Sequence, residues 1–515
     1  MKPACIRRGT AALCTLLCAA LLVGCAPQSA SSSTAGGGVP AAQSSASDNG
    51  EFVLPYSSAE GFNPYTSKST ITLQNSRLLF RSFVDITNDY ELVYNVASAV
   101  VSTGNEVTIT VGGSFADGTA ITGADAAASL EAARASSVFG ARFANVSAVR
   151  AAGNTVTVTL QKPDSLFAYL LDIPVMKAGE TASTSPTSSG RYSVSSTADG
   201  VALTANASFA DKTPFDTIKL VELSGYDALV SSLNLGVISL FSSEQESDLA
   251  GSIVCNTSYF NLNNLVFIGI QPQSPDSPLN QPALRQAISL GISRRQIADK
   301  AYYSRAYVAT GVINPRFPGE SAAATLAEEA DTAKAKALIE SLGYTMDDAS
   351  GFYQSADGKR LSFSLLCYTG SSFKRYAASL VAEELSRIGI EVTVSEDSDF
   401  TSYSEKISSG TAPLYIGEVK LYNNMDMDAF FGAGNARARV TPSDALLAAY
   451  DAMKADKTAL AGFETAFAAE MPFVPLVYKN GVATYSKDFS GLTPTVSDIF
   501  YSFENLTIDN ATQKE

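Results

Sequence analysis

The densest group of hydrogen-bonding side chains follows an apolar run at 414–419. It comprises Glu418, Lys420, Tyr422, Asn423 and Asn424. A carboxylate, an ammonium, a phenol and two amides in so short a segment suit the binding of a small polar ligand. Two alternatives stay open, because Asn-Asn also favours a plain turn and Glu418 and Lys420 can pair with each other across a loop.

Two further segments are candidates for ligand contact. Tyr368 and Thr369 follow an apolar-rich run that ends at Cys367, and Asn63 and Tyr65 flank a proline near the start of the chain. The Asn-Pro-Tyr segment is equally consistent with a turn. We keep all four residues as predicted ligand contacts.

Catalysis and metal binding are not predicted. The chain has no histidine, so Ser-His-Asp and Cys-His catalysis and histidine-based zinc sites are excluded. Asp426 and Asp428 are spaced two apart, but nothing places a carboxyl in an apolar pocket that would raise its pKa. We predict a binding protein with neither a metal ion nor a cofactor, in which aromatic stacking must come from Tyr or Phe because Trp is absent.

The elements that position these residues are predicted most clearly between 361 and 419. A strand at 361–367 is followed by a helix at 373–388, a strand at 390–394, a short helix near 402–407 and a strand at 414–419. This β-α-β-α-β order predicts parallel strands. Ligands of open parallel sheets bind beyond the carboxyl ends of the strands, where Tyr368 and the 418–424 segment would lie.

An earlier block, 80–185, is predicted to be a small α+β unit. Strands at 107–111 and 156–160 alternate apolar and polar residues. Between them, Thr122 and Asp125 have the spacing of a capping box and open an alanine-rich helix.

The first 25 residues predict export. Lys2, Arg7 and Arg8 precede an apolar run at 11–23, and the sequence Leu-Val-Gly-Cys ends at Cys25. This pattern is typical of a signal peptide and resembles a bacterial lipobox. We predict a signal at 1–24, a lipid on Cys25, and a flexible Ser/Ala/Gly tether through residue 50.

The composition narrows the choice of partners and redox state. The formal charge is −15, and no Lys/Arg cluster lies on a predicted helix, so nucleic-acid binding is not expected. In the body, Cys255 and Cys367 lie far apart and are predicted to be free thiols, although export would permit a disulfide.

Several motifs, in order, resemble the extracytoplasmic solute-binding proteins of peptide and nickel ABC importers, family 5. They are FADGTAITGAD at 115–125, SGRY at 189–192, PALRQAI at 282–288 with Ser293-Arg294, SRIGIEV at 386–392 and MPFVPL at 471–476. The resemblance implies an α/β, two-lobed periplasmic-binding-protein-like fold (type II, cluster C) with an extra small α+β domain.

The resemblance also implies boundaries. One lobe would combine 51–79, 186–268 and 476–515, the accessory domain would be 80–185, and the second lobe would be 269–475. Ligand would bind between the lobes, which close around it.

The ligand expected from the resemblance is a short peptide. Peptide binders of this family carry a Trp and an Asp after the strand at 414–419, where this chain has Lys420 and Asn423. An asparagine anchors an ammonium group more weakly than a carboxylate does, and Glu418, Asp426 or Asp428 would have to supply the charge.

The remaining expectations follow from the same resemblance. The partners would be an ABC permease and its ATPase, and the protein would be a monomer held to the outer face of the membrane only by its lipid. Alternatives are a nickel chelate, haem or an oligosaccharide as ligand, or a surface sensor or adhesin that no longer transports.

Overall fold

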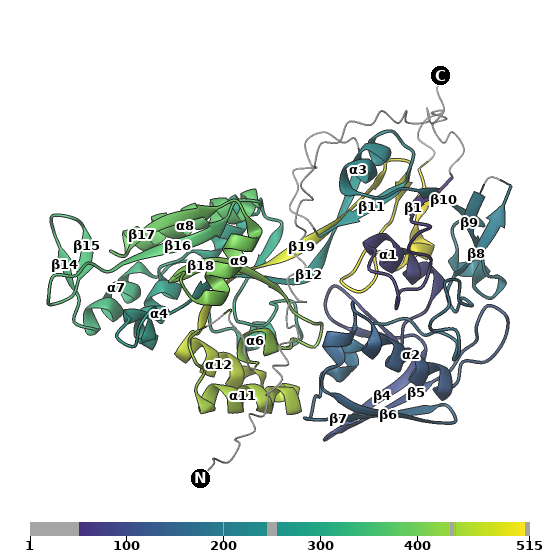
Figure 1. The fold of residues 1–515 in the computed structure, drawn as a ribbon, viewed down its shortest axis with the longest axis horizontal. Helices are drawn as coiled ribbons and strands as arrows, with labels where there is room; N and C mark the ends of the chain where they lie inside the picture. Colours follow the sequence, from purple (N-terminus) through teal and green to yellow (C-terminus); the bar gives the residue numbers. More distant parts are fainter. Residues whose placement is uncertain (1–50, 199, 245–254, 433–436, 438, 510–515) are drawn as a thin grey trace, which may run out of the picture. The chain divides into compact units, whose positions relative to one another are not determined.

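The computed structural model describes residues 51–509, apart from 199, 245–254, 433–436 and 438 (Figure 1). The predicted signal, Cys25 and the predicted tether lie outside the described residues. No helix among the described residues is long and apolar enough to cross a membrane.

The N-terminal part is built on two four-stranded sheets. One has the order β1-β10-β9-β8, with β1 parallel to β10 and the other pairs antiparallel. The second sheet is antiparallel, has the order β4-β5-β7-β6, and contacts helix α2. The strands are β1 (Val53–Tyr56), β10 (Thr217–Glu222), β9 (Gly200–Ala205), β8 (Tyr192–Thr197), β4 (Ala97–Thr103), β5 (Glu106–Val111), β7 (Thr155–Leu160) and β6 (Val146–Ala152).

The helices of this part begin at clear signals. In α1 (Thr70–Leu79), Ser69 accepts a hydrogen bond from the Thr72 amide at the N-terminus. The predicted capping box of Thr122 and Asp125 opens α2 (Gly123–Ala135). Smaller elements are β2 (Val84–Ile86), β3 (Leu92–Tyr94), α3 (Tyr226–Asn234), β20 (Phe489–Ser490), β21 (Thr507–Ile508), and the 3-10 turns at Gly140–Phe143, Phe167–Leu170, Ala207–Lys212 and Phe503–Asn505.

The largest sheet has seven strands in the order β11-β19-β12-β18-β16-β17, with β13 pairing β19. Strand β16 is parallel to both β17 and β18, which confirms the predicted β-α-β-α-β order between 361 and 419. The elements are β11 (Leu240–Ser243), β19 (Phe473–Ser486), β12 (Cys255–Ile270), β18 (Leu414–Lys420), β16 (Ser362–Tyr368), β17 (Glu391–Asp397), β13 (Ala306–Val308), α8 (Ser372–Arg387) and α9 (Phe400–Ser409).

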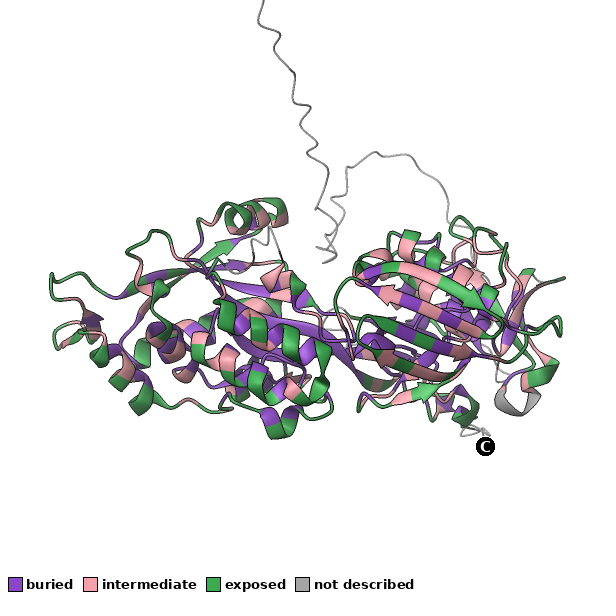
Figure 2. Cartoon of the chain, turned by 90° about the horizontal axis from the view of Figure 1, so that it is seen from below, coloured by how far each residue is buried: buried purple, intermediate pink, exposed green. Residues whose placement is uncertain are grey.

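Further helices pack around this sheet, and Figure 2 shows them with one buried and one exposed face. Pro282 begins α4 at the first helical position, where its missing N–H costs nothing. The elements are α4 (Pro282–Leu290), α5 (Arg294–Gln296), a π-helical turn (Ile297–Ala301), α6 (Glu320–Ala323), α7 (Thr332–Ser341), β14 (Thr345–Asp347), β15 (Phe352–Gln354), α10 (Asp428–Phe431), α11 (Asp444–Ala455) and α12 (Leu460–Glu470), with 3-10 turns at Pro278–Asn280 and Lys457–Ala459.

Two large hydrophobic cores fill the described chain. What we call the N-terminal core gathers buried residues of the two smaller sheets and of the C-terminal segment, such as Phe52, Ile109 and Phe503. The central core gathers residues of the large sheet and its helices, such as Ile268 and Leu385, and also takes Ile86, Tyr90, Leu166 and Tyr169 from the N-terminal part. The proposed lobe boundaries stay a prediction, with the accessory block sharing the N-terminal core.

Strands β12 and β19 run through both cores. Phe260 and Leu262 lie in the N-terminal core, whereas Leu265 lies in the central core. Between them, the register of the β12–β19 pair shifts from Asn261 to Leu265. The change of core therefore falls on the polar stretch 261–264.

The two cysteines of the described chain are free. Cys367 is buried and Cys255 is partly buried, as predicted for unpaired thiols.

Candidate functional site

The predicted ligand segment leaves β18 and turns sharply. Leu421 donates its amide to the Asn263 carbonyl over 2.9 Å, and the Met425 amide donates to the Tyr422 carbonyl over 2.9 Å. Met425 has a φ of 54°, in the left-handed region. The turn buries Asn423 and Asn424 instead of leaving them on the surface.

Asn423 bonds across to the N-terminal part. Its Nδ2 donates to Asp172 Oδ2 over 3.0 Å, and its Oδ1 accepts from Asn263 Nδ2 over 2.7 Å. Both ends of the amide are therefore used, and its orientation is fixed.

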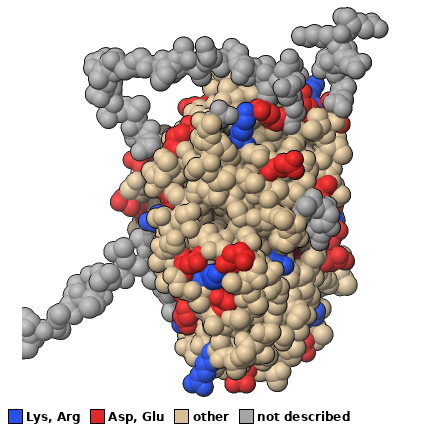
Figure 3. Space-filling model, turned by 90° about the vertical axis from the view of Figure 1, so that its right-hand side faces the viewer, with Lys and Arg blue, Asp and Glu red and all other residues tan. Residues whose placement is uncertain are grey.

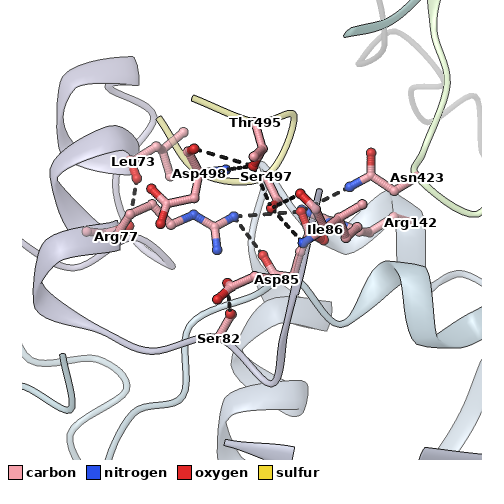
Figure 4. Close-up of polar contacts among 12 residues, drawn as sticks. Leu73, Arg77, Ser82, Asp85, Ile86, Arg142, Asn423, Thr495, Ser497 and Asp498 are labelled. Atoms are coloured by element: carbon pink, nitrogen blue, oxygen red, sulfur yellow. Dashed lines mark hydrogen bonds and ion pairs between the residues drawn. The ribbon is translucent and has the colours of Figure 1, made fainter. Parts of the chain in front are cut away.

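Asp172 is held by two arginines. Arg142 pairs with its Oδ1, and Arg77 lies 3.7 Å from its Oδ2 while also donating to the Asp172 carbonyl over 2.7 Å. Figure 4 shows Asn423 pointing toward the group of side chains that includes Arg142, with Arg77 beyond it beside Asp85 and Asp498. A carboxylate this deeply buried needs such partners.

Asn263 continues the chain of hydrogen bonds into the central core. Its Oδ1 accepts from the Tyr90 hydroxyl and from Asn314 Nδ2, the latter over 3.2 Å. Burial raises the pKa of Tyr90 well above its usual value, so the phenol keeps its proton. The resulting relay runs in one direction, from Asn314 and Tyr90 through Asn263 and Asn423 to Asp172.

Asn424 also forms a hydrogen bond to the N-terminal part. Its Nδ2 donates to Asp164 Oδ2 over 2.8 Å, and the same oxygen lies 2.9 Å from Lys454 Nζ. Lys454 Nζ also lies 3.4 Å from the Asn424 carbonyl oxygen. Asp164 comes from the N-terminal part, whereas Lys454 is on α11.

Tyr422 is inserted toward the N-terminal core, against which it packs. Its buried hydroxyl has no hydrogen-bond partner among the described residues. Burial raises the pKa of Tyr422, and the positive charge of Arg142 lowers it in part. The hydroxyl is thus a buried donor near Arg142, suited to a ligand acceptor.

Glu418 takes partners other than Lys420. Its carboxylate lies 2.5 Å from Lys374 Nζ and 3.0 Å from Lys479 Nζ, and it accepts from Asn264 Nδ2 over 2.7 Å. Burial would raise the pKa of Glu418, but the two lysines and Asn264 hold it well below its usual range. Lys420 pairs with Glu244 instead, so the alternative of a Glu418–Lys420 bridge is not what the structure has.

The other predicted contacts lie in two further places. Tyr368 packs edge-on against Phe400, with ring centroids 5.3 Å apart, and the Thr369 amide donates to the Asp397 carbonyl. Asn63 donates to the carbonyls of Thr181 and Ser183 over 2.9 and 2.7 Å, and the Tyr65 hydroxyl donates to the Pro174 carbonyl. Ligand contact by these four residues stays a prediction.

Two cavities lie in the N-terminal part. One of about 250 Å³ has Arg77, Arg81 and Arg191 in its wall, and one of about 390 Å³ has Phe62, Asp117 and Asn206 in its wall. No residue of 418–424 lines either of them. Charged side chains on the face shown in Figure 3 are scattered among uncharged ones.

The sequence analysis missed the residues that contact the 422–424 segment or hold those contacts in place. They are Arg77, Arg142, Asp164, Asp172, Asn263 and Lys454. A local pattern accounts for Asp164 alone, because its Oδ1 accepts from the Leu166 amide at the start of a 3-10 turn.

Comparison with known proteins gives a consistent result. Residues 93–439 match the family model described as bacterial extracellular solute-binding proteins, family 5 Middle. A search of curated protein sequences finds no significant match.

Solved structures resemble the chain over most of its length. The oligopeptide-binding protein AppA from Bacillus subtilis, in complex with a nonapeptide, is 17% identical over 90% of this chain and 99% of its own, with a TM-score of 0.58. A nickel ABC transporter protein from Bacillus halodurans is 17% identical over 87% and 97%, with a TM-score of 0.70. The substrate-binding protein CtaP from Listeria monocytogenes is 19% identical over 90% and 99%, with a TM-score of 0.67. These likenesses confirm the predicted two-lobed α/β fold.

Proposed function

Because the chain belongs to the bacterial extracellular solute-binding proteins of family 5, we propose that it captures short peptides for an ABC importer. The ligand would lie where residues 422–424 meet the N-terminal part. These residues belong to the central part, which is the large sheet with its helices. A permease with its ATPase would receive the ligand. The observation that carries this proposal is the pairing of Asn423 with Asp172 across the two parts. Side chains from both parts are what a ligand needs to favour a closed form.

The choice of a peptide rests on the chemistry of the segment. Asn424 Oδ1 and the Tyr422 hydroxyl are buried without hydrogen-bond partners among the described residues. One is an acceptor and the other a donor, which suits the N–H and C=O groups of a peptide main chain. A nickel chelate is less well supported as the ligand, because the chain has no histidine to ligate the metal.

The remaining parts of the proposal concern place and assembly. Cys25 would carry the lipid that holds a monomeric protein at the outer face of the membrane, and residues 26–50 would be its tether. Further ligand contacts would come from six other residues, which are Asn63, Tyr65, Tyr368, Thr369, Glu418 and Lys420.

The first experiment identifies the small molecules that co-purify with the protein. The full chain is purified from membranes in mild detergent, denatured, and its released small molecules are identified by mass spectrometry. We expect short peptides. Release of no small molecule, together with no change in thermal midpoint on adding a mixed peptide library, would contradict the proposal.

The site is tested separately by calorimetry with a peptide so identified. Asn423→Ala should weaken binding by about tenfold or more, because it removes the amide that links Asn263 to Asp172 across the two parts. Asn105→Ala is the matched control, since Asn105 is exposed and its side chain donates to the Gln161 carbonyl. Equal affinity of the two variants would remove Asn423 from the site.

A further inference from the structure

The contacts of Asp164 form a compact unit across two parts of the chain. The Asp164 side chain is 3% exposed and that of Lys454 is 9% exposed. Asp164 Oδ2 lies 2.9 Å from Lys454 Nζ and accepts a hydrogen bond from Asn424 Nδ2 over 2.8 Å. Asp164 Oδ1 accepts a hydrogen bond from the Leu166 backbone amide over 3.0 Å. Both carboxylate oxygens therefore have partners within the protein.

Two further hydrogen bonds join the same two stretches. The Ser165 amide donates to the Lys454 carbonyl over 2.7 Å, and the Lys457 amide donates to Ser165 Oγ over 3.1 Å. These contacts connect the end of α11 to the chain just before the 3-10 turn at Phe167–Leu170.

Apolar contacts accompany them. Leu166 and Tyr169 belong to the central core, while their neighbours Phe167 and Leu170 belong to the N-terminal core. Phe317 packs against Tyr169 and Tyr90, with ring centroids 5.2 and 5.5 Å away. The stretch 164–170 is thus seated between the cores.

We propose that Asp164, Lys454 and Asn424 form a clasp that holds block 80–185 against the central part without a ligand. A ligand that binds only a closed form gains affinity in proportion to the fraction already closed. The clasp would then set how tightly the protein holds its solute. That last step rests on the proposed function, whereas the clasp itself does not.

The clasp predicts the behaviour of an isosteric variant. Asp164→Asn keeps the shape and the bond from the Leu166 amide, but it leaves the Lys454 ammonium buried without a counter-ion. Because such a variant can fail by unfolding, we pair it with Asp164→Asn/Lys454→Met, which removes the stranded charge as well. Lys162→Gln is the control, since Lys162 and Asp451 form an exposed ion pair between the same two stretches.

The measurement is hydrogen exchange of the full chain, without ligand, followed by mass spectrometry. Peptides covering 162–170 and 449–457 should exchange roughly tenfold or more faster in the double variant than in the wild type. Peptides covering 97–111, in the same block but away from the clasp, should not change. Lys162→Gln should behave as the wild type.

Each outcome decides the question. Faster exchange confined to the two clasp peptides, at an unchanged thermal midpoint of the double variant, supports the clasp even if no solute is ever identified. Wild-type exchange in the double variant overturns it, because the stretch is then held by the hydrogen bonds of Ser165 and by the packing of Leu166 and Tyr169. Faster exchange throughout 97–111 also overturns it, since Asp164 then serves overall stability and not local closure.

Discussion

Asn423 Nδ2 donates to Asp172 Oδ2 over 3.0 Å, joining two residues that are 251 positions apart in the sequence. An amide at position 423 can donate to this carboxylate, whereas a carboxylate there would repel it. The pairing therefore gives a physical reason for an asparagine at position 423.

Asn423→Asp should make stability depend on pH. Two facing carboxylates raise the pKa of one of them in the folded state. A raised folded-state pKa gives stability that is present at low pH and lost as pH rises through it. We expect a loss of about 1–3 kcal/mol at pH 7 and a smaller loss at pH 4, measured by urea unfolding. Asn105→Asp, at an exposed site, is the control, and an equal loss at both pH values would contradict the repulsion.

Glu418 should show the opposite dependence. Its pKa lies below the usual range despite burial, because Lys374 and Lys479 stabilise the charge. Its contribution is present above the unfolded-state pKa and is lost only as pH falls through the lowered value. Glu418→Gln should cost about 3–5 kcal/mol at neutral pH, with the difference from wild type shrinking in strong acid.

The control for Glu418 is the exposed ion pair made by Lys420, which lies on the same strand as Glu418. Glu244→Gln removes the exposed ion pair with Lys420 and should cost no more than about 1 kcal/mol. Similar losses in both variants would mean that the two lysines do not depend on Glu418.

Local sequence patterns predicted those parts of the fold that depend on neighbours in the chain. The periodic apolar residues of α8, the alternation of β17 and the apolar runs of β16 and β18 identified three parallel strands and their connections. The Thr122–Asp125 spacing identified the start of α2. In each case the residues that define the element are close together in the sequence.

The partners of the site could not be found in the same way. Asn424 and Asp164 are 260 positions apart, and each residue in isolation fits a turn. Glu418 and Lys420 are two apart on β18 and so point to the same face of the strand, a spacing that allows an ion pair between them. The carboxylate of Glu418 instead pairs with Lys374 and Lys479, and Lys420 pairs with Glu244, because the fold brings these distant groups beside the strand.

The two thiols should react at very different rates. Burial raises the pKa of Cys367 to about 11, and burial raises the pKa of the less enclosed Cys255 as well. At pH 8 we expect iodoacetamide to modify Cys255 in the folded protein and Cys367 only after denaturation. Peptide mapping by mass spectrometry separates the two sites, and modification of Cys367 at the same rate as Cys255 would contradict its burial.

The buried pair Glu320 and Glu464 should make the protein less stable as pH rises. Glu464 accepts from the backbone amides of Val312 and Ile313 over 3.0 and 2.9 Å. A Cβ added at Gly311 would lie 2.1 Å from Glu320 Oε1 and 2.6 Å from Glu464 Cδ, so both carboxyls crowd this glycine. Burial raises the pKa of both glutamates, and the charge of Glu464 raises that of Glu320 further.

The sign follows from the raised folded-state pKa values. Below the unfolded-state pKa both carboxyls are protonated in the folded and the unfolded chain, and the pair does not lower the free energy of unfolding. As pH rises through the folded-state pKa values, the unfolded chain ionises first, and the free energy of unfolding falls. Glu320→Gln keeps a donor toward Glu464 but cannot ionise. It should therefore raise the free energy of unfolding by about 1–3 kcal/mol at pH 8 and change it little at pH 4.

Urea unfolding between pH 4 and pH 9 tests this expectation. The slope of stability against pH should become shallower in Glu320→Gln without vanishing, because burial also raises the pKa of Glu384 to about 7 and of Asp498 to about 6. Glu328→Gln removes an exposed ion pair with Arg295 and should leave the slope as it is. A Glu320→Gln variant that loses stability at pH 8 would mean that the charged form of Glu320 is the one the fold requires, and that a cation compensates it there.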